Sequence, residues 1–166
     1  MKGVQCVALL LMAMPVAVGA SDREAIFGLW ASTNSIIDVG ERDGALHATI
    51  VAILDPVYKE GEDGPVGATR ADLKNPDSSL RSRPLVGLDL LSEYRYKKDK
   101  WQGSLYDPDS GKTYKSQMTV NDGKLQMRGY IGTPMLGRTE EWVPVSTCSG
   151  NIPKMLANAN LKTPCG

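Results

Sequence analysis

Histidine is nearly absent from the sequence, and this scarcity limits the chemistry that the protein can perform. His47 is the only histidine, and no Gly-x-Ser-x-Gly stretch occurs that could supply a serine nucleophile for it to activate. The three cysteines include no Cys-x-x-Cys pattern, so the ligands of a zinc site are missing as well. We therefore expect no catalytic residues, no metal and no cofactor, and we do not interpret the protein as an enzyme.

An excess of charge of either sign is also missing. Lys plus Arg and Asp plus Glu both number 19, so the chain has no net field to attract nucleic acid or an anionic membrane. Hydrophobic residues make up 42% of the 166 residues, which is typical of a globular chain with one core of ordinary size. We accordingly expect a single folded domain and no nucleic-acid partner.

A phosphate-binding loop is the third absence, although Gly111-Lys112-Thr113 resembles the end of one. Tyr106 occupies the position at which that motif has its first glycine. The residues after Thr113 alternate like a strand rather than a helix, and Asp-Pro-Asp-Ser-Gly before Lys112 is typical of a turn. The stretch predicts a hairpin, not a nucleotide site.

One long apolar run is present, and it lies at the N-terminus. Lys2 precedes an apolar stretch from Val4 to Val18, and Val18-Gly19-Ala20 has the small residues that signal peptidase prefers. Residues 1–20 therefore predict a signal peptide cleaved near Ala20, a periplasmic or secreted protein, and no stable membrane anchor. A buried N-terminal helix is the alternative.

Removal of residues 1–20 would leave two cysteines, Cys148 and Cys165. An even pair in an oxidising compartment predicts a disulfide, which would close the C-terminal extension, residues 146–166, into a loop. Two free thiols on a frayed tail are the alternative.

Between these ends, short alternating runs recur, separated by Gly, Asn, Asp and Pro. Loop 55–84 is rich in Gly, Pro and charge, and Asn75-Pro76 predicts one short helical turn with Asn75 as its N-cap. The spacing favours an all-β fold over residues 21–145, and closure into a barrel removes exposed strand edges. The expected strands are 25–32, 35–39, 45–54, 87–97, 101–106, 112–120, 124–132 and 138–145.

The last expected strand carries an unusual face. Arg138, Glu140 and Trp142 share it by alternation. If Trp142 points inward, Arg138 and Glu140 point inward with it and need partners or a ligand. The alternative is that Trp142 covers the barrel end while Arg138 lies at a solvated rim.

Three blocks of sequence occur in the same order as in one known family. They are NPDSSLRSRPLVGLDLL, GSLYDPDSGKTYKSQMTV and LQMRGYIGTPMLGRTEEW. With GLW near residue 28, they resemble the exported bacterial family known as domain of unknown function 2147. The resemblance implies an antiparallel up-and-down lipocalin-like barrel of about eight strands, and no established activity. Members often carry a cysteine pair in the hairpin after Gly-x-Trp, whereas IIDVGERDGALHATIV has none.

The lipocalin likeness also implies structural roles for three residues. Such barrels begin with Gly-x-Trp, here Gly28 and Trp30, and a late basic side chain packs across that tryptophan. Arg138 is the best match to this basic residue, and cation–π packing on Trp30 is then expected to stabilise the fold.

Two functional hypotheses follow. The first is a barrel that binds a small hydrophobic or amphipathic ligand, such as a fatty acid. The second is an envelope interaction or structural protein with a filled barrel, an unknown protein partner, and contact surfaces at 81–85 and 132–137. The candidate lining residues of the first are Tyr94, Tyr96, Tyr106, Tyr114, Met118, Met127, Arg128, Arg138 and Trp142.

Overall fold

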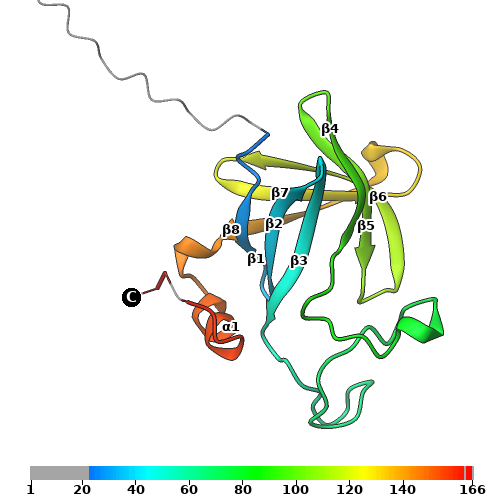
Figure 1. The fold of residues 1–166 in the computed structure, drawn as a ribbon, viewed down its shortest axis with the longest axis vertical. Coiled ribbons are helices and arrows are strands. Elements are labelled where there is room, and N and C mark those ends of the chain that lie inside the picture. Colours follow the sequence, from blue (N-terminus) through cyan, green and yellow to red (C-terminus); the bar gives the residue numbers. More distant parts are fainter. Residues whose placement is uncertain (1–22, 163, 166) are drawn as a thin grey trace, which may run out of the picture.

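The computed structural model describes residues 23–162 and 164–165, and its centre is one antiparallel sheet (Figure 1). The predicted signal peptide, residues 1–20, lies outside the described residues. The sheet order is β3-β2-β1-β8-β7-β6-β5-β4, so each strand pairs with the next along the chain except β3 and β4, which form the two edges. The strands are β1 (Gly28–Ala31), β2 (Ser35–Arg42), β3 (Ala45–Ile53), β4 (Leu91–Lys97), β5 (Lys100–Asp107), β6 (Lys112–Asn121), β7 (Lys124–Tyr130) and β8 (Arg138–Pro144).

The sheet curls into a nearly closed barrel through two contacts. The first and last strands meet where Trp30 pairs with Pro144 and Ala31 with Val143. On the other side, segment 87–90, just before β4, bonds to β3: the amide of Ile50 donates to Leu88 O (2.9 Å), and that of Leu90 donates to Ala48 O (2.9 Å). The all-β, eight-stranded up-and-down barrel predicted from the sequence is therefore confirmed.

The hairpin between β5 and β6 contains the stretch that resembles a phosphate-binding loop. Asp107 pairs with Lys112 across it, and the turn residues between them place Gly111 at a positive φ of 68°. A Cβ at Gly111 would lie 1.9 Å from Lys74 O, because the long loop packs directly on this turn. The structure thus confirms the hairpin and explains on steric grounds why residue 111 is a glycine.

Two hydrophobic clusters lie on opposite faces of the barrel wall. The inner cluster fills the barrel, and the outer one lies between β1–β3 and α1 (Ile152–Asn158), where Ile152, Met155 and Leu156 are buried. Figure 1 shows α1 beside the lower ends of these strands. Cys148 and Cys165 form the predicted disulfide, with Cα atoms 5.6 Å apart. The helix itself was not predicted.

A β-bulge in the β2–β3 pair changes which residues face each cluster. Ile37 pairs with Ile50, but Ile36 pairs with Ala52, so Val51 is the extra residue. The bulge turns Ala52 outward beside Ile36, toward α1, while Ile37 and Ile50 stay inside. Strict alternation from Leu46 predicts Ala52 and Leu54 on the inner face, and the bulge shows that this is wrong.

Segment boundaries differ from the prediction at three places. Residues 23–26 form a turn rather than the start of a strand, and Ile26 from this turn is buried in the barrel. The 3₁₀ helix η1 (Ser78–Leu80) has Asp77 as its N-cap, not Asn75. Two further 3₁₀ turns, η2 (Pro134–Leu136) and η3 (Val145–Thr147), flank β8. Within the described chain, no helix combines the length and apolarity required to cross a bilayer.

Candidate ligand site inside the barrel

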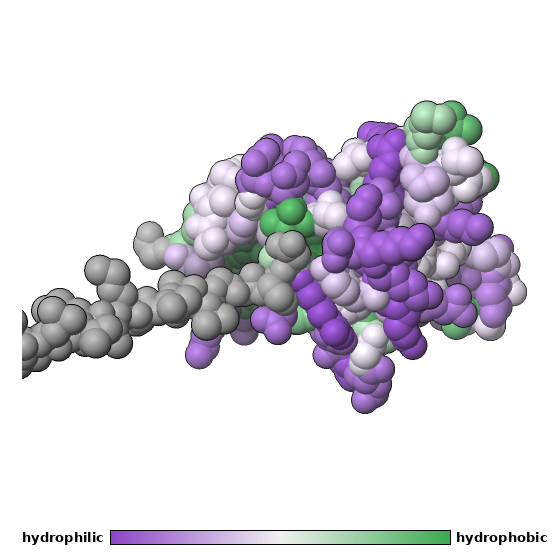
Figure 2. All heavy atoms as spheres, turned by 90° about the horizontal axis from the view of Figure 1, so that it is seen from above, coloured by the Kyte–Doolittle hydropathy of each residue, from purple (hydrophilic) through white to green (hydrophobic). Residues whose placement is uncertain are grey.

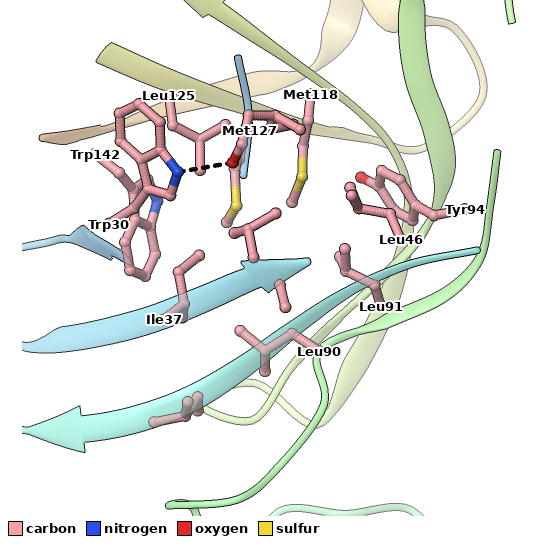
Figure 3. Packing of buried hydrophobic residues seen from close by; sticks show 14 of the residues in the cluster. Trp30, Ile37, Leu46, Leu90, Leu91, Tyr94, Met118, Leu125, Met127 and Trp142 are labelled. Carbon is pink, nitrogen blue, oxygen red and sulfur yellow. Dashed lines mark hydrogen bonds between the residues drawn. The ribbon is translucent and has the colours of Figure 1, made fainter. Parts of the chain in front are cut away.

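The barrel interior is lined by aromatic and thioether side chains. The three tryptophans, Trp30, Trp101 and Trp142, are each at most 6% exposed, and Tyr94, Met118 and Met127 are buried with them. Figure 3 shows the thioethers of Met118 and Met127 between the indoles of Trp30 and Trp142 and the ring of Tyr94. Four predicted lining residues, Tyr94, Met118, Met127 and Trp142, thus lie together in the interior.

Most polar atoms of these interior side chains have partners. Trp30 Nε1 donates to Ile26 O (2.8 Å) and Trp101 Nε1 donates to Arg23 O (3.0 Å), so the N-terminal turn satisfies two indoles. The Tyr94 hydroxyl bonds the hydroxyl of buried Ser116, and burial raises the pKa of Tyr94 well above its usual range despite this bond.

Trp142 is the exception. Trp142 is only 5% exposed, and its Nε1 is a buried nitrogen without a hydrogen-bond partner among the described residues. An unsatisfied indole N–H in an apolar interior is unfavourable, because the desolvation of a polar group goes uncompensated. Among the residues that the structure describes, the interior therefore contains one side-chain donor without an acceptor.

The remaining predicted tyrosines lie in different places. Tyr96 is half-buried, and its ring lies in an edge-to-face arrangement with Trp101, with the ring centroids 5.4 Å apart. Tyr114 is half-buried and shares the face of Ser116 and Met118 by alternation. The Tyr106 hydroxyl, however, is directed to the long loop, where it donates to Asp72 (2.6 Å). The Tyr106 ring packs against the inner cluster, but its hydroxyl bonds the loop and does not face the interior.

Arg128 also lies outside the interior. Its guanidinium donates to Pro134 O (2.7 Å), Thr139 Oγ1 (2.8 Å) and Met135 O (3.2 Å). Strand alternation explains this placement, since Met127 points into the core and its neighbour must point away. Arg128 holds the β7–β8 loop instead of a ligand.

The structure does not place Arg138 on Trp30, so this expectation was wrong. Trp30 pairs with Pro144, and Arg138 lies six positions earlier on β8, roughly 20 Å along an extended chain. Arg138 is exposed, which agrees with the rim position that the sequence left open. Among the described residues, Arg23 makes cation–π contacts with the interior aromatic rings. Its Cζ lies 5.5 Å from the ring centroid of Trp101 and 5.9 Å from that of Tyr96.

A polar cluster that the sequence did not reveal holds the long loop against β5. Asp72 is fully buried and accepts from Arg83 Nη2 (2.8 Å), Asn75 Nδ2 (2.7 Å) and the Tyr106 hydroxyl. Burial, followed by the bond to Asp72, raises the pKa of Tyr106. Every acceptor of this carboxylate is engaged, so the cluster anchors the loop rather than offering a free site. Its spacing, Asp-x-x-Asn with a later arginine, carries no recognised signal.

Two cavities accompany the same loop outside the barrel. One, of about 320 Å³, is bordered by residues 83–84 and 86–89. The other, of about 260 Å³, carries charges of both signs, but these pair with one another: Arg70 with Glu62, and Lys74 with Asp63 at 3.8 Å. Hydrogen bonds from the Lys59 amide and then from the Arg70 guanidinium lower the pKa of Glu62. Since Glu62 and Asp63 already have cationic partners, we place the candidate site in the barrel interior.

His47 has a partner outside the barrel. Its Nδ1 bonds Asp89, whose other carboxylate oxygen accepts from the amides of Ala48 (3.1 Å) and Leu91 (3.1 Å). The pair connects β3 with the segment before β4, so its geometry indicates a structural role in barrel closure.

An up-and-down barrel of eight strands that begins with Gly-x-Trp and encloses an aromatic interior defines a lipocalin-like fold. A solved structure described as "Protein HP1028 from the human pathogen Helicobacter pylori belongs to the lipocalin family" is similar, with a TM-score of 0.57 and 22% identity over 82% of this chain and 90% of that chain. At this identity the likeness concerns the fold alone.

The sequence profile of the family described as "Uncharacterized protein conserved in bacteria (DUF2147)" matches residues 28–143, and the chain belongs to that family. No curated protein sequence matches the chain.

Proposed function

We propose that the protein is an exported, non-enzymatic carrier that binds one small amphipathic or hydrophobic ligand inside its barrel. The free N–H of Trp142 is the observation that carries the proposal. A ligand with an acyl oxygen would supply the missing acceptor, and its hydrocarbon part would replace contacts among apolar side chains. The disulfide between Cys148 and Cys165 supports export to an oxidising compartment.

Entry of such a ligand requires space in the packed interior, and the methionines can provide it. Met118 and Met127 pair across β6 and β7, and Figure 3 places both thioethers in the middle of the cluster. Thioether side chains are unbranched and change rotamer at little cost, so they can move aside for an acyl chain. Leu125, which pairs with Trp142, forms the neighbouring wall.

The test uses the purified protein without detergent, examined by native mass spectrometry and then titrated with medium- and long-chain fatty acids. All three tryptophans belong to the interior cluster, so their fluorescence reports ligand entry directly. We expect a discrete added mass that is lost on denaturation, and a saturable change in fluorescence.

The matched variants are Trp142→Phe and Trp101→Phe. Both keep an aromatic ring, but only Trp142 has a free N–H, since Trp101 already donates to Arg23 O. We expect Trp142→Phe to weaken fatty-acid binding about tenfold or more, the loss of one hydrogen bond to a charged group. Trp101→Phe should lower stability but leave affinity nearly unchanged. A bare mass and no saturable response would refute the carrier and favour a filled barrel that acts through its surface.

A further inference from the structure

The loop between β7 and β8 exposes three large apolar side chains within six residues. Ile131 is 74% exposed, Met135 85% and Leu136 80%, higher than any other large apolar residue of the described chain. Figure 2 shows an apolar projection at the right-hand end of the molecule, the side on which this loop lies in Figure 1. Such a concentration of exposed apolar surface is typical of an interaction site.

The backbone of this loop, which we call the apolar tip (residues 131–136), is held internally. The amides of Leu136 and Gly137 donate to Thr133 O (3.2 Å) and Pro134 O (3.1 Å), while Pro134 has no N–H. The carbonyls of Pro134 and Met135 accept from the Arg128 guanidinium. These backbone groups therefore need no water, and this removes much of the cost of entering an apolar phase.

Cationic and aromatic side chains surround the base of the apolar tip. Tyr130 immediately precedes it and pairs with Lys115 of β6, and Arg138 follows it on β8. Lys115 and Arg138 are both exposed, and the nearest carboxylate along the chain is Glu140. In such an arrangement the apolar side chains can enter the acyl region of a bilayer, while tyrosine, lysine and arginine at the base lie among the headgroups.

We propose that the apolar tip docks the protein on a lipid bilayer by shallow insertion of Ile131, Met135 and Leu136, with Lys115 and Arg138 beside anionic headgroups. A protein partner would need a complementary hollow, whereas a small projecting tip whose backbone is partly satisfied internally needs only a fluid apolar layer. The chain has no net charge, so insertion of the tip, not long-range attraction, dominates binding. The inference does not depend on a ligand in the barrel.

The experiment is sedimentation of the purified protein with vesicles of phosphatidylcholine and phosphatidylglycerol. Mass spectrometry first verifies that residues 1–20 are absent, because that apolar run would itself bind lipid. We expect the protein to sediment with the vesicles, more strongly as the phosphatidylglycerol content rises. The double substitution Met135→Ser and Leu136→Ser should lower vesicle affinity about tenfold or more, since both apolar side chains lose their contribution.

The control is Val66→Ser with Leu80→Ser, which removes two exposed apolar side chains of the long loop instead. This variant should bind vesicles like the unsubstituted protein, and thermal melts should show both double variants folded. Ile131→Ser, a single change at 74% exposure, gives a second test should the double variant be unstable. Absence of vesicle binding, or equal losses in tip and control variants, overturns the proposal.

Discussion

At the level of single residues, the interior combines apolar packing with one buried phenol. The Tyr94 side chain is fully buried, and within residues 23–162 and 164–165 its hydroxyl has only the hydroxyl of Ser116 as partner. Since a phenolate would be left without solvation there, the phenol stays protonated to higher pH in the folded protein than in the unfolded chain.

This burial predicts a pH dependence of stability. The stabilising contribution of Tyr94 is complete below its ordinary pKa of 10.0 and is lost as the pH rises through the raised folded-state pKa. We expect the unfolding free energy above pH 10 to fall less steeply in Tyr94→Phe, by as much as about 1.4 kcal/mol per pH unit. Urea unfolding at a series of alkaline pH values measures this slope.

The control for this prediction is Ser116→Ala. It removes the same hydrogen bond but leaves the buried phenol in place, so the steep alkaline loss should persist. Equal slopes in the Tyr94→Phe variant and the unsubstituted protein would contradict the argument.

Among the strands, irregularities in pairing decide which side chains reach the core. A register shift in β4 between Ser92 and Arg95 turns Tyr94 inward, and Glu93 adopts a positive φ of 57° beside it. Gly103 of β5 lies opposite this irregularity. The absence of a side chain at Gly103 therefore provides the space that the Tyr94 ring occupies.

Gly103→Ala tests this relation. The new Cβ would lie 2.4 Å from Tyr94 Cδ2 and 2.7 Å from Tyr94 Cα, and backbone atoms cannot move aside cheaply. We expect a loss of about 1–3 kcal/mol in unfolding free energy, the usual cost of overpacking. In Gly40→Ala, on β2, the Cβ meets nothing within 4 Å, so the change should stay within about 1 kcal/mol. Urea unfolding of both variants decides, and a Gly103→Ala variant as stable as Gly40→Ala would refute the steric account.

For the whole molecule, barrel closure depends on the contact between the two edge strands, β3 and β4, which do not form a regular strand pair. β3 and segment 87–90 share only a few backbone bonds, and Asp89 adds to them by accepting from the amides of Ala48 and Leu91. His47 in turn bonds the same carboxylate. One aspartate thus connects both sides of the closure.

Asp89→Ala should therefore weaken the closure more than an ordinary surface change. Two backbone donors lose their acceptor, so we expect a loss of about 1–3 kcal/mol in unfolding free energy. Hydrogen exchange should accelerate at the amides of Ala48 and Leu91 in particular. Asp63→Ala, which removes an exposed carboxylate 3.8 Å from Lys74, serves as the control and should change little. Unchanged exchange at Ala48 and Leu91 would show that Asp89 does not hold the closure.

The prediction from sequence succeeded where the signal is local. Period-two alternation and turn residues such as Asp122-Gly123 located all eight strands and the up-and-down order. It failed where a single inserted residue changes the pattern: the bulge at Val51 reversed the direction of Ala52, and nothing in the local composition marks it. The helix Ile152–Asn158 was missed because it is short and its apolar face is defined by the barrel wall that it covers.

The candidate site shows the same division. Tyr94, Met118, Met127 and Trp142 were expected to line the barrel because of their aromatic and thioether character, and they are buried there. The polar groups of Tyr106 and Arg128 were not placed by the sequence, because their partners, Asp72 and the carbonyls of Pro134 and Met135, come from loops whose paths no strand pattern predicts. Arg138 was misplaced because its distance from Trp30 depends on the register between β1 and β8.

The amino-acid sequence alone determined the all-β class, the strand order, the cysteine pair and the chemical character of the core, since each follows from alternation, turn chemistry or composition. Only the tertiary structure decided that Arg23 rather than Arg138 packs on the aromatic rings, that Asp72 anchors the loop, and that Trp142 keeps a free N–H. These depend on side chains brought together from distant segments, and the geometry of such contacts is set by register and loop path, which act over the whole barrel and leave no local trace.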